Sequence, residues 1–165
     1  ESGHPPRKFA RLFAQCRKLG LKLCMHAGEE GPPAYVHEAI FDIGVDRIDH
    51  GNRAMEDPDL IAAIIDRNLT LTVCPLSNTA LKVIDKIEDS PVGNMLDKGI
   101  SVTINSDDPA YFGGYMTENF ISLYDNLSLS KGQALRLVKN SIDASFAPKK
   151  RKKVLYSILD EFATE

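Results

Sequence analysis

Residues 21 to 29 read Leu-Lys-Leu-Cys-Met-His-Ala-Gly-Glu, an apolar run that leads into a histidine, a glycine and a carboxylate. The run follows Gly20 and is typical of a short buried strand. Period-two alternation puts His26 on the more polar face, which points into a barrel or cleft if the other face packs on helices. Gly28 permits a sharp bend that can bring the Glu29 carboxyl over the same end. For this stretch alone, a structural histidine followed by a helix-starting glutamate is an equally good interpretation.

The same pattern recurs along the chain. Strand-like runs at residues 45–50, 69–74 and 100–106 follow at spacings of about 25 to 30 residues, each with a helical pattern behind it. Such a βα repeat predicts parallel strands joined by right-handed crossovers. The polar groups at or just after the strand ends are His26, His50, Ser77, Asn78, Asp107 and Asp108. Parallel α/β folds build their sites at this edge, so we expect these groups to meet there.

The alternative architecture is a doubly wound nucleotide-binding sheet. It is disfavoured because no strand is followed by G-x-G-x-x-G or G-x-x-x-x-G-K-[ST]. Four βα units make half of a (β/α)₈ barrel, so we predict an α/β fold in which residues 1–165 form a single partial domain. Covering helices are expected at about residues 5–19, 32–43, 57–67, 91–98, 117–127, 131–145 and 148–162. Ser77 and Asn78 are expected in a polar loop, and His37 on the surface.

Composition narrows the class of protein. The chain has 165 residues, of which 43% are hydrophobic and 26% charged, enough for a globular core. A net charge of −3 offers no basic surface for nucleic acid or for an anionic membrane, and no apolar run approaches the roughly 20 residues of a membrane span. The three cysteines form no C-x-x-C pair, which favours reduced thiols in a cytoplasmic protein over a disulfide. The chain begins at Glu1 without an initiator Met, which suggests a fragment.

The groups at the strand ends favour a metal site. Two histidines and an aspartate are ligand types for Zn²⁺ or Fe²⁺, and a nearby glutamate can carry protons for a metal-activated water. Their spacing is not that of a zinc finger and does not identify a metal site by itself. The rival constellation is a Ser-His-Asp triad that uses Ser77 or Ser106, but neither serine lies in a G-x-S-x-G elbow.

Four motifs together resemble the adenosine/adenine deaminase family, metal-dependent amidohydrolases with a (β/α)₈ barrel. The motifs are His26-Ala27-Gly28-Glu29, Arg47-Ile48-Asp49-His50-Gly51, Cys74-Pro75-Leu76-Ser77-Asn78 and Asn105-Ser106-Asp107-Asp108-Pro109. Within the family the chain looks most like the adenine deaminases. The features that carry this finer resemblance are Asp49 before His50, Leu81-Lys82-Val83, and the run Asn-Ser-Asp-Asp-Pro-Ala-Tyr-Phe-Gly-Gly at 105–114.

The resemblance implies a role for each matching residue. His26 and Asp107 would be ligands of one Zn²⁺ per site, with Fe²⁺ as the alternative metal. Glu29 would protonate the purine ring at N1, and His50 would orient and deprotonate the water at the metal. Asp108 would hydrogen-bond the purine at N7, and the other residues expected on the substrate side are Gly28, Ser77 and Asn78. For its role Glu29 must hold a proton near neutral pH, which burial favours.

One departure from the family pattern is large. The family's other two metal ligands form a His-x-His on the first barrel strand, and this chain contains no His-x-His. The resemblance therefore implies the C-terminal half of the barrel, with the N-terminal half as its missing partner. Such a half would bind metal weakly, expose two open sheet edges and be inactive on its own.

The predicted function is hydrolytic deamination of adenine to hypoxanthine and ammonia, a purine-salvage reaction of the cytoplasm on a small-molecule substrate. The alternatives are deamination of adenosine or of an N6-substituted adenine by the same fold, and a catalytically inactive half-barrel that serves as an association module. Phosphotriester or urea-type amidohydrolysis is disfavoured, because no lysine stands at a strand's carboxyl end where carbamylation would be needed.

Overall fold

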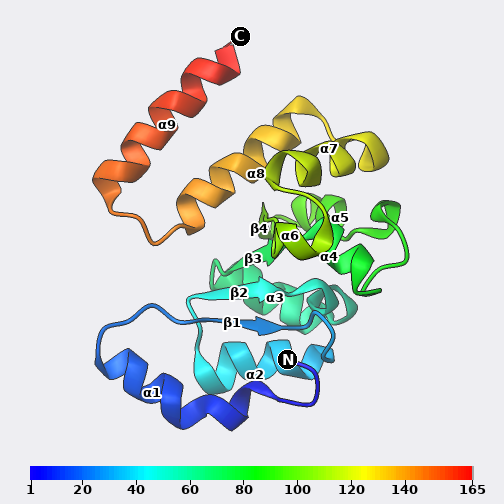
Figure 1. The fold of residues 1–165 in the computed structure, drawn as a ribbon. Helices are drawn as coiled ribbons and strands as arrows, with labels where there is room; N and C mark the ends of the chain where they lie inside the picture. The colour runs from blue at the N-terminus through cyan, green and yellow to red at the C-terminus, as the bar shows by residue number, and fades with distance from the viewer. Residues whose placement is uncertain (165) are drawn as a thin grey trace.

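A computed structural model describes residues 1–164 of the chain. It contains a sheet of four parallel strands in sequential order, β1 (Cys24–Ala27), β2 (Arg47–His50), β3 (Thr70–Val73) and β4 (Ser101–Ile104). Figure 1 shows them stacked one above the next between the two ends of the chain. Sequential parallel order needs one crossover between each pair of strands, so the arrangement is half of a (β/α)₈ barrel, as predicted.

The predicted helices fall close to their expected ranges. The helices are α1 (Ala10–Lys18), α2 (Pro33–Glu38), α3 (Pro58–Asp66), α4 (Pro75–Ala80), α5 (Val92–Asp97), α6 (Pro109–Phe112), α7 (Met116–Leu127), α8 (Lys131–Ala144) and α9 (Lys149–Thr164). Two of these, the short helices α4 and α6, were not predicted. Short helical turns add η1 (Pro6–Phe9), η2 (Ala39–Ile43), η3 (Asn52–Glu56) and η4 (Ile87–Asp89). Proline at the first position starts several of them, because that residue needs no backbone N–H there.

Two expectations need correction. Ser77 and Asn78 were expected in a loop, but they lie in α4, which Pro75 starts directly after β3. The first helix, expected at about residues 5–19, was predicted to cover the sheet, and its apolar residues Phe9, Leu12, Phe13, Cys16 and Leu19 form one stripe. Yet no residue of α1 is buried, and Leu12 and Leu19 face solvent. Phe13 and Cys16 on the same helix do pack against the core, so α1 covers the sheet with only part of its stripe.

One face of the sheet carries the core. Parallel register places Met25, Ile48, Leu71 and Val102 side by side on this face. The last three are completely buried in one hydrophobic cluster with apolar residues of α2, α3, α5 and α8. The helices cover this outer face, and its burial supplies most of the stabilisation of the half-barrel.

The other face of the sheet is polar. It presents His26, Asp49, Thr72 and Thr103 in one cross-strand row, and Cys24, Arg47, Thr70 and Ser101 in the row below. The polar groups pair with one another: Thr70 Oγ1 lies 2.9 Å from Ser101 Oγ, and Thr72 Oγ1 donates to Asp49 Oδ1 at 3.1 Å. In a barrel this inner face lines the interior. The row that contains His26 and Asp49 therefore lies inside the barrel, next to the carboxyl ends of the strands where the site is expected.

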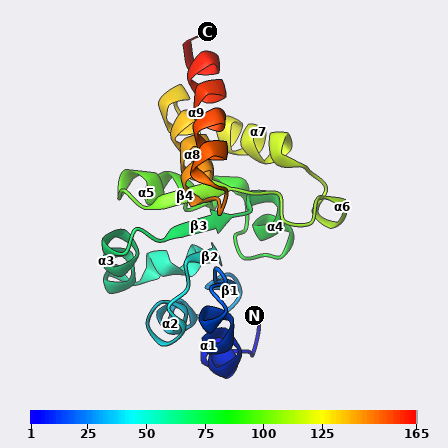
Figure 2. The same ribbon diagram turned by 90° about the vertical axis from the view of Figure 1, so that its left-hand side faces the viewer.

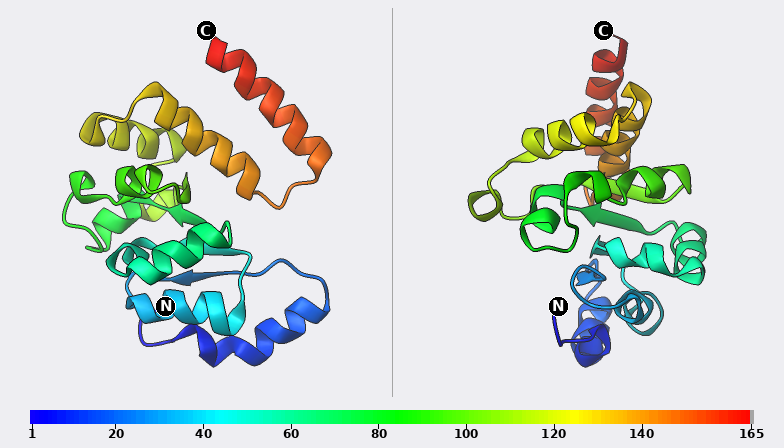
Figure 3. Two further views of the ribbon diagram at one scale, coloured as in Figure 1. Left: turned by 180° about the vertical axis from the view of Figure 1, so that it is seen from behind. Right: turned by 90° about the vertical axis from the view of Figure 1, so that its right-hand side faces the viewer.

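The last helices extend away from the sheet. In Figures 2 and 3, α9 rises beside α8 and ends far from the strands. Between α8 and α9 lies an apolar groove of about 470 Å³, lined by Leu135, Val138, Leu155, Ile158 and Phe162 among others. Among the described residues, no helix is both long and apolar enough to cross a membrane.

Candidate active site

The carboxyl ends of the strands bring the predicted histidines and aspartate together. The rings of His26 and His50 have centroids 4.9 Å apart, and His50 Nε2 lies 3.8 Å from Asp107 Oδ2. His50 and Asp107 adopt positive φ angles of 62° and 55°, which non-glycine residues rarely do. The backbone therefore bends sharply just where each strand ends, and the side chains meet over the rim.

Glu29 joins this group from the loop after β1. Its carboxyl is buried, with Oε1 3.1 Å from His50 Nδ1. Gly28 makes the bend with a φ of 74°, and a Cβ there would lie 2.5 Å from a methyl group of Val36. The N-terminal residue also holds this loop in place: the carboxylate of Glu1 accepts hydrogen bonds from the backbone N–H groups of residues 28 to 30. The bend predicted from Gly28 is thus present and closely packed.

Ser77 and Asn78 lie behind these groups. Ser77 Oγ donates to Asp107 Oδ2 at 2.6 Å, and Asn78 Nδ2 donates to Glu29 Oε1 at 3.0 Å. The same amide nitrogen lies 3.2 Å from His50 Nδ1. Both side chains are completely buried, and burial can only increase when more of the barrel is present. Their contacts position Asp107 and Glu29. The substrate contact expected of them from the sequence stays a prediction.

Burial sets the protonation states of Glu29 and His50. It raises the pKa of Glu29 to about 7, with the negative charges of Asp107 and Glu1 acting in the same direction. Burial also lowers the pKa of His50 to about 4, and the nearby His26 adds to the effect. Near neutral pH, Glu29 can therefore hold a proton while His50 stays neutral, which provides a proton donor and a proton acceptor 3.1 Å apart.

The donor atoms suit a divalent metal. His26, Glu29 and His50 each offer one ligand atom, and these atoms all lie within 4.8 Å of one another. His50, Cys74 and Asp107 form a second such group that shares His50. Burial raises the pKa of the Cys74 thiol to about 12, so without a metal the thiol stays protonated near neutral pH. The remaining imidazole and carboxylate donors fit Zn²⁺ or Fe²⁺.

Asp108 lies outside this cluster in the structure. Its exposed carboxylate accepts a hydrogen bond from the backbone N–H of Tyr111 at 3.2 Å and so caps α6. His37 is exposed on α2, where its ring packs against Phe41, as the sequence predicted. Cys16, Cys24 and Cys74 are free thiols, which also agrees with the sequence.

Comparison with known proteins now places the chain. Residues 1–162 match the family model described as Adenosine deaminase. The chain belongs to the adenosine deaminase family. A relative from Marinomonas sp. (strain MWYL1), named adenine deaminase, is 59% identical over 146 residues, which are 88% of this chain and 44% of that protein. A second, from Paraburkholderia xenovorans (strain LB400) and also named adenine deaminase, is 49% identical over 97% of this chain and 46% of its own length.

Solved structures agree with the fold of this family member. The crystal structure of adenine deaminase from Arthrobacter aurescens matches with a TM-score of 0.97 and 46% identity, over 100% of this chain and 50% of that chain. An amidohydrolase from Burkholderia ambifaria, solved with bound Zn, matches at 23% identity with a TM-score of 0.88, over 97% of this chain and 45% of that chain; at this identity it shows the fold alone. The chain spans about half the length of the curated relatives it matches.

Some residues of this candidate site were not identified from the sequence. Asn52 Nδ2 donates to Asn78 Oδ1 at 2.8 Å, and Glu1 binds the loop that carries Glu29. Asn52 follows the His50-Gly51 pair directly, so its closeness to a strand end was a usable signal. Glu1 gave no such signal, because its contact is made across 27 residues of chain.

Proposed function

We propose that this chain is the C-terminal half of an adenine deaminase, which hydrolyses adenine to hypoxanthine and ammonia in cytoplasmic purine salvage. The observation that supports this best is the buried Glu29, whose pKa is raised to about 7 beside a neutral His50. The other ring nitrogen of His50 lies 3.8 Å from Asp107. The same residues stand in a chain about half identical to proteins named adenine deaminase. An acid that is protonated at neutral pH is what attack on an aromatic ring carbon needs.

In the proposed reaction, water adds to C6 of the purine and one of its protons passes to His50. Glu29 delivers its proton to N1, so that negative charge does not build up on the ring. His50 then returns its proton to the amino nitrogen, the bond between C6 and that nitrogen breaks, and ammonia leaves. The proton of the C6 hydroxyl passes back to the Glu29 carboxylate as the C6 carbonyl of hypoxanthine forms. A divalent metal held by His26 and Asp107 would supply a water nucleophile that is active at neutral pH.

The buried polar residues support these roles by fixing their geometry. Asn78 donates to the Glu29 oxygen that faces His50, and Ser77 donates to Asp107. Both donors come from α4, so one short helix sets the positions of the proton donor and of a metal ligand. Side chains held in this way need little rearrangement during the reaction.

The test uses the completed barrel, meaning this chain joined to an upstream half that carries a His-x-His strand. Adenine consumption and ammonia release are followed for the parent and for Glu29→Gln, which keeps the shape of the side chain but cannot donate a carboxyl proton. We expect kcat to fall by about 10²- to 10⁴-fold, the usual contribution of general acid catalysis. The matched control is Glu30→Gln, an exposed neighbour, which should stay within about two-fold of the parent.

Parent-like turnover by the Glu29→Gln enzyme would contradict the proposed role. A clear preference for adenosine or an N6-substituted adenine over adenine would replace the proposed substrate by one of those. A completed barrel that binds metal but turns over none of these purines would favour a non-catalytic half-barrel.

A further inference from the structure

We infer that Asp49 positions the ligand histidine His26, by presenting its carboxylate to the ring nitrogen that does not face the metal. The inference rests on the proposed function, since that function makes His26 a ligand. It starts from the register of β1 and β2, in which His26 and Asp49 are direct neighbours on the inner face. Asp49 Oδ2 lies 3.8 Å from His26 Nδ1, an ion-pair distance, and Nε2 is left as the ring nitrogen available to a metal.

The Asp49 carboxylate is itself held from two sides. Its other oxygen, Oδ1, accepts a hydrogen bond from Thr72 Oγ1 at 3.1 Å, and Thr72 is the register partner of Asp49 on β3. The same oxygen lies 3.8 Å from Arg47 Nε. A carboxylate fixed in this way can hold the neighbouring imidazole in one orientation.

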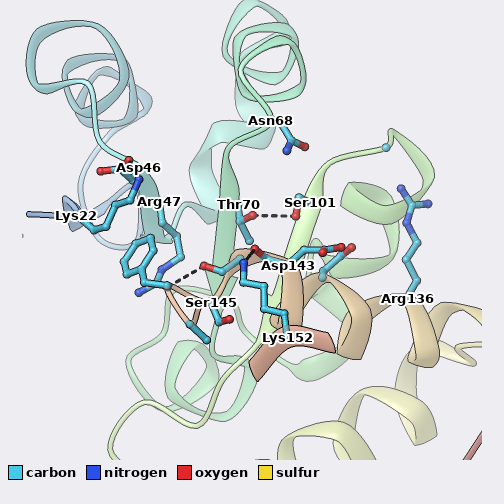
Figure 4. Close-up of a pocket in the computed structure, with 15 residues that line it drawn as sticks. Lys22, Asp46, Arg47, Asn68, Thr70, Ser101, Arg136, Asp143, Ser145 and Lys152 are labelled. Atoms are coloured by element: carbon cyan, nitrogen blue, oxygen red, sulfur yellow. Dashed lines mark hydrogen bonds and ion pairs between the residues drawn. The ribbon is translucent and has the colours of Figure 1, made fainter. Parts of the chain in front are cut away.

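Arg47 connects this pair to the opposite end of the strands. It lines a cavity of about 620 Å³ together with residues at the strand starts, such as Thr70 and Ser101, and with the loop after α8. Figure 4 shows these side chains around the cavity. Its Nη1 donates to the carbonyl of Ala144 at 3.3 Å, and its guanidinium lies 4.5 Å from the centre of the Phe146 ring. The guanidinium is therefore anchored at the amino-terminal end of the strands, and its buried Nε lies 3.8 Å from Asp49 Oδ1 without a hydrogen bond to any residue described.

The two rim histidines differ in how much help they need. His50 is only 2% exposed and is held by packing and by Glu29, whereas the side chain of His26 is 54% exposed. An exposed imidazole keeps rotational freedom that it must lose on binding a metal, unless a neighbour already fixes it. Asp49 is the carboxylate placed to do so. Its negative charge beside Nδ1 favours the tautomer with the proton on that nitrogen, although the 3.8 Å separation is longer than a hydrogen bond.

The test measures metal affinity and needs no turnover. The completed barrel is titrated with Zn²⁺ against a chromophoric chelator, for the parent, Asp49→Asn, Asp49→Ala and Thr72→Val. Loss of an outer carboxylate behind a ligand histidine weakens metal binding about 10- to 100-fold, which we expect for Asp49→Ala. Asp49→Asn should weaken Zn²⁺ binding by a smaller factor, because one side-chain oxygen remains. Thr72→Val should weaken it by a smaller factor still. The matched control is Asp66→Asn, which removes one exposed carboxylate elsewhere and should leave the affinity within two-fold.

A second readout separates positioning from folding. With Zn²⁺ in excess, the Asp49 variants should recover most of their adenine turnover, because the metal then occupies the weakened site. Urea unfolding of the metal-free proteins identifies a structural defect, which would lower the free energy of unfolding before any metal is added. Zn²⁺ affinities of both Asp49 variants within two-fold of the parent would overturn the inference. If His26→Ala also left the affinity unchanged, the ligand assignment would fail with it. Weakened Zn²⁺ binding in the Asp49 variants of a barrel inactive on adenine would support the inference while the proposed function failed.

Discussion

The two faces of the sheet use the same four strands for opposite purposes. On the outer face Ile48, Leu71 and Val102 are completely buried under helices. On the inner face their neighbours in the chain are polar and bind one another, as Asp49 does with Thr72. Because successive residues of a strand point to opposite sides, a single run of sequence can carry both. Apolar burial on the outer face supplies most of the free energy of folding. This free energy offsets the cost of burying polar groups on the inner face.

The two faces also differ in how well they tolerate substitution. Apolar burial is non-directional and depends on area, so the outer face needs volume and shape. The inner face needs donors and acceptors in pairs, and removing one partner leaves the other unsatisfied in a buried place. The two faces should therefore respond to substitution in different ways. The predictions below test that contrast in the completed barrel, from the largest effect on stability to the smallest.

Ile48→Ala tests the outer face and should cause the largest loss. The side chain is completely buried in the centre of the sheet, so its removal leaves a cavity and should lower the free energy of unfolding by about 2–5 kcal/mol. Ser101→Ala, on the inner face, removes a hydrogen bond to Thr70 and should cost about 1 kcal/mol. Urea unfolding measures both. A Ser101→Ala loss as large as that of Ile48→Ala would break the contrast between the faces.

Glu29→Gln should make the metal-free protein more stable above pH 7, even though it removes activity. Glu29 has its pKa raised from 4.5 to about 7 in the folded state, so the folded protein binds the proton more tightly than the unfolded chain does. The parent therefore loses stability as pH rises from 4.5 to 7, by up to about 3 kcal/mol, while a glutamine has no proton to lose. Urea unfolding with a chelator present, across this pH range, measures the difference. The two proteins should be alike below pH 4.5, and a pH-independent difference would contradict the assignment.

Asn78→Ala tests the polar pairs behind the rim. The side chain donates to Glu29 and accepts from Asn52, both buried, so alanine leaves two polar groups without their partner. We expect a loss of about 1–3 kcal/mol in the free energy of unfolding, together with reduced kcat. Asn94→Ala, at an exposed position of α5, is the matched control and should stay within about 0.5 kcal/mol. Equal losses of unfolding free energy in the two variants would show that the stability contribution of Asn78 does not come from its buried hydrogen bonds.

His37→Ala should have the smallest effect. His37 is exposed on α2, where its ring packs against Phe41, and it belongs to neither group of candidate metal ligands. Its loss should change the free energy of unfolding by no more than about 0.5 kcal/mol and leave Zn²⁺ affinity unchanged. His26→Ala, assayed beside it by chelator competition, should weaken Zn²⁺ binding strongly. A comparable weakening by His37→Ala would mean that the rim is not where the metal binds.

Most of the architecture followed from patterns that are local in sequence. The βα repeat was visible in the spacing of apolar runs, and prolines and glycines marked the helix starts and strand ends. Ser77 and Asn78 were the exception. Polar residues after Pro75 resemble a loop in composition, but they form α4 because Ser77 and Asn78 find buried partners that only the folded chain provides. The apolar stripe of the first helix also predicted burial only in part, since Leu12 and Leu19 remain exposed in this half of the barrel.

By itself, the sequence determined the half-barrel fold, the family and the convergence of His26, His50 and Asp107 at one edge, because strand direction and strand ends follow from local patterns and short motifs. Only the tertiary structure decided the burial of Glu29, the proton that burial lets it keep, and the pairing of Asp49 with His26. A pKa depends on every charge and every layer of protein around the group, and a cross-strand contact depends on register. Both arise between residues far apart in the chain, so no local pattern encodes them.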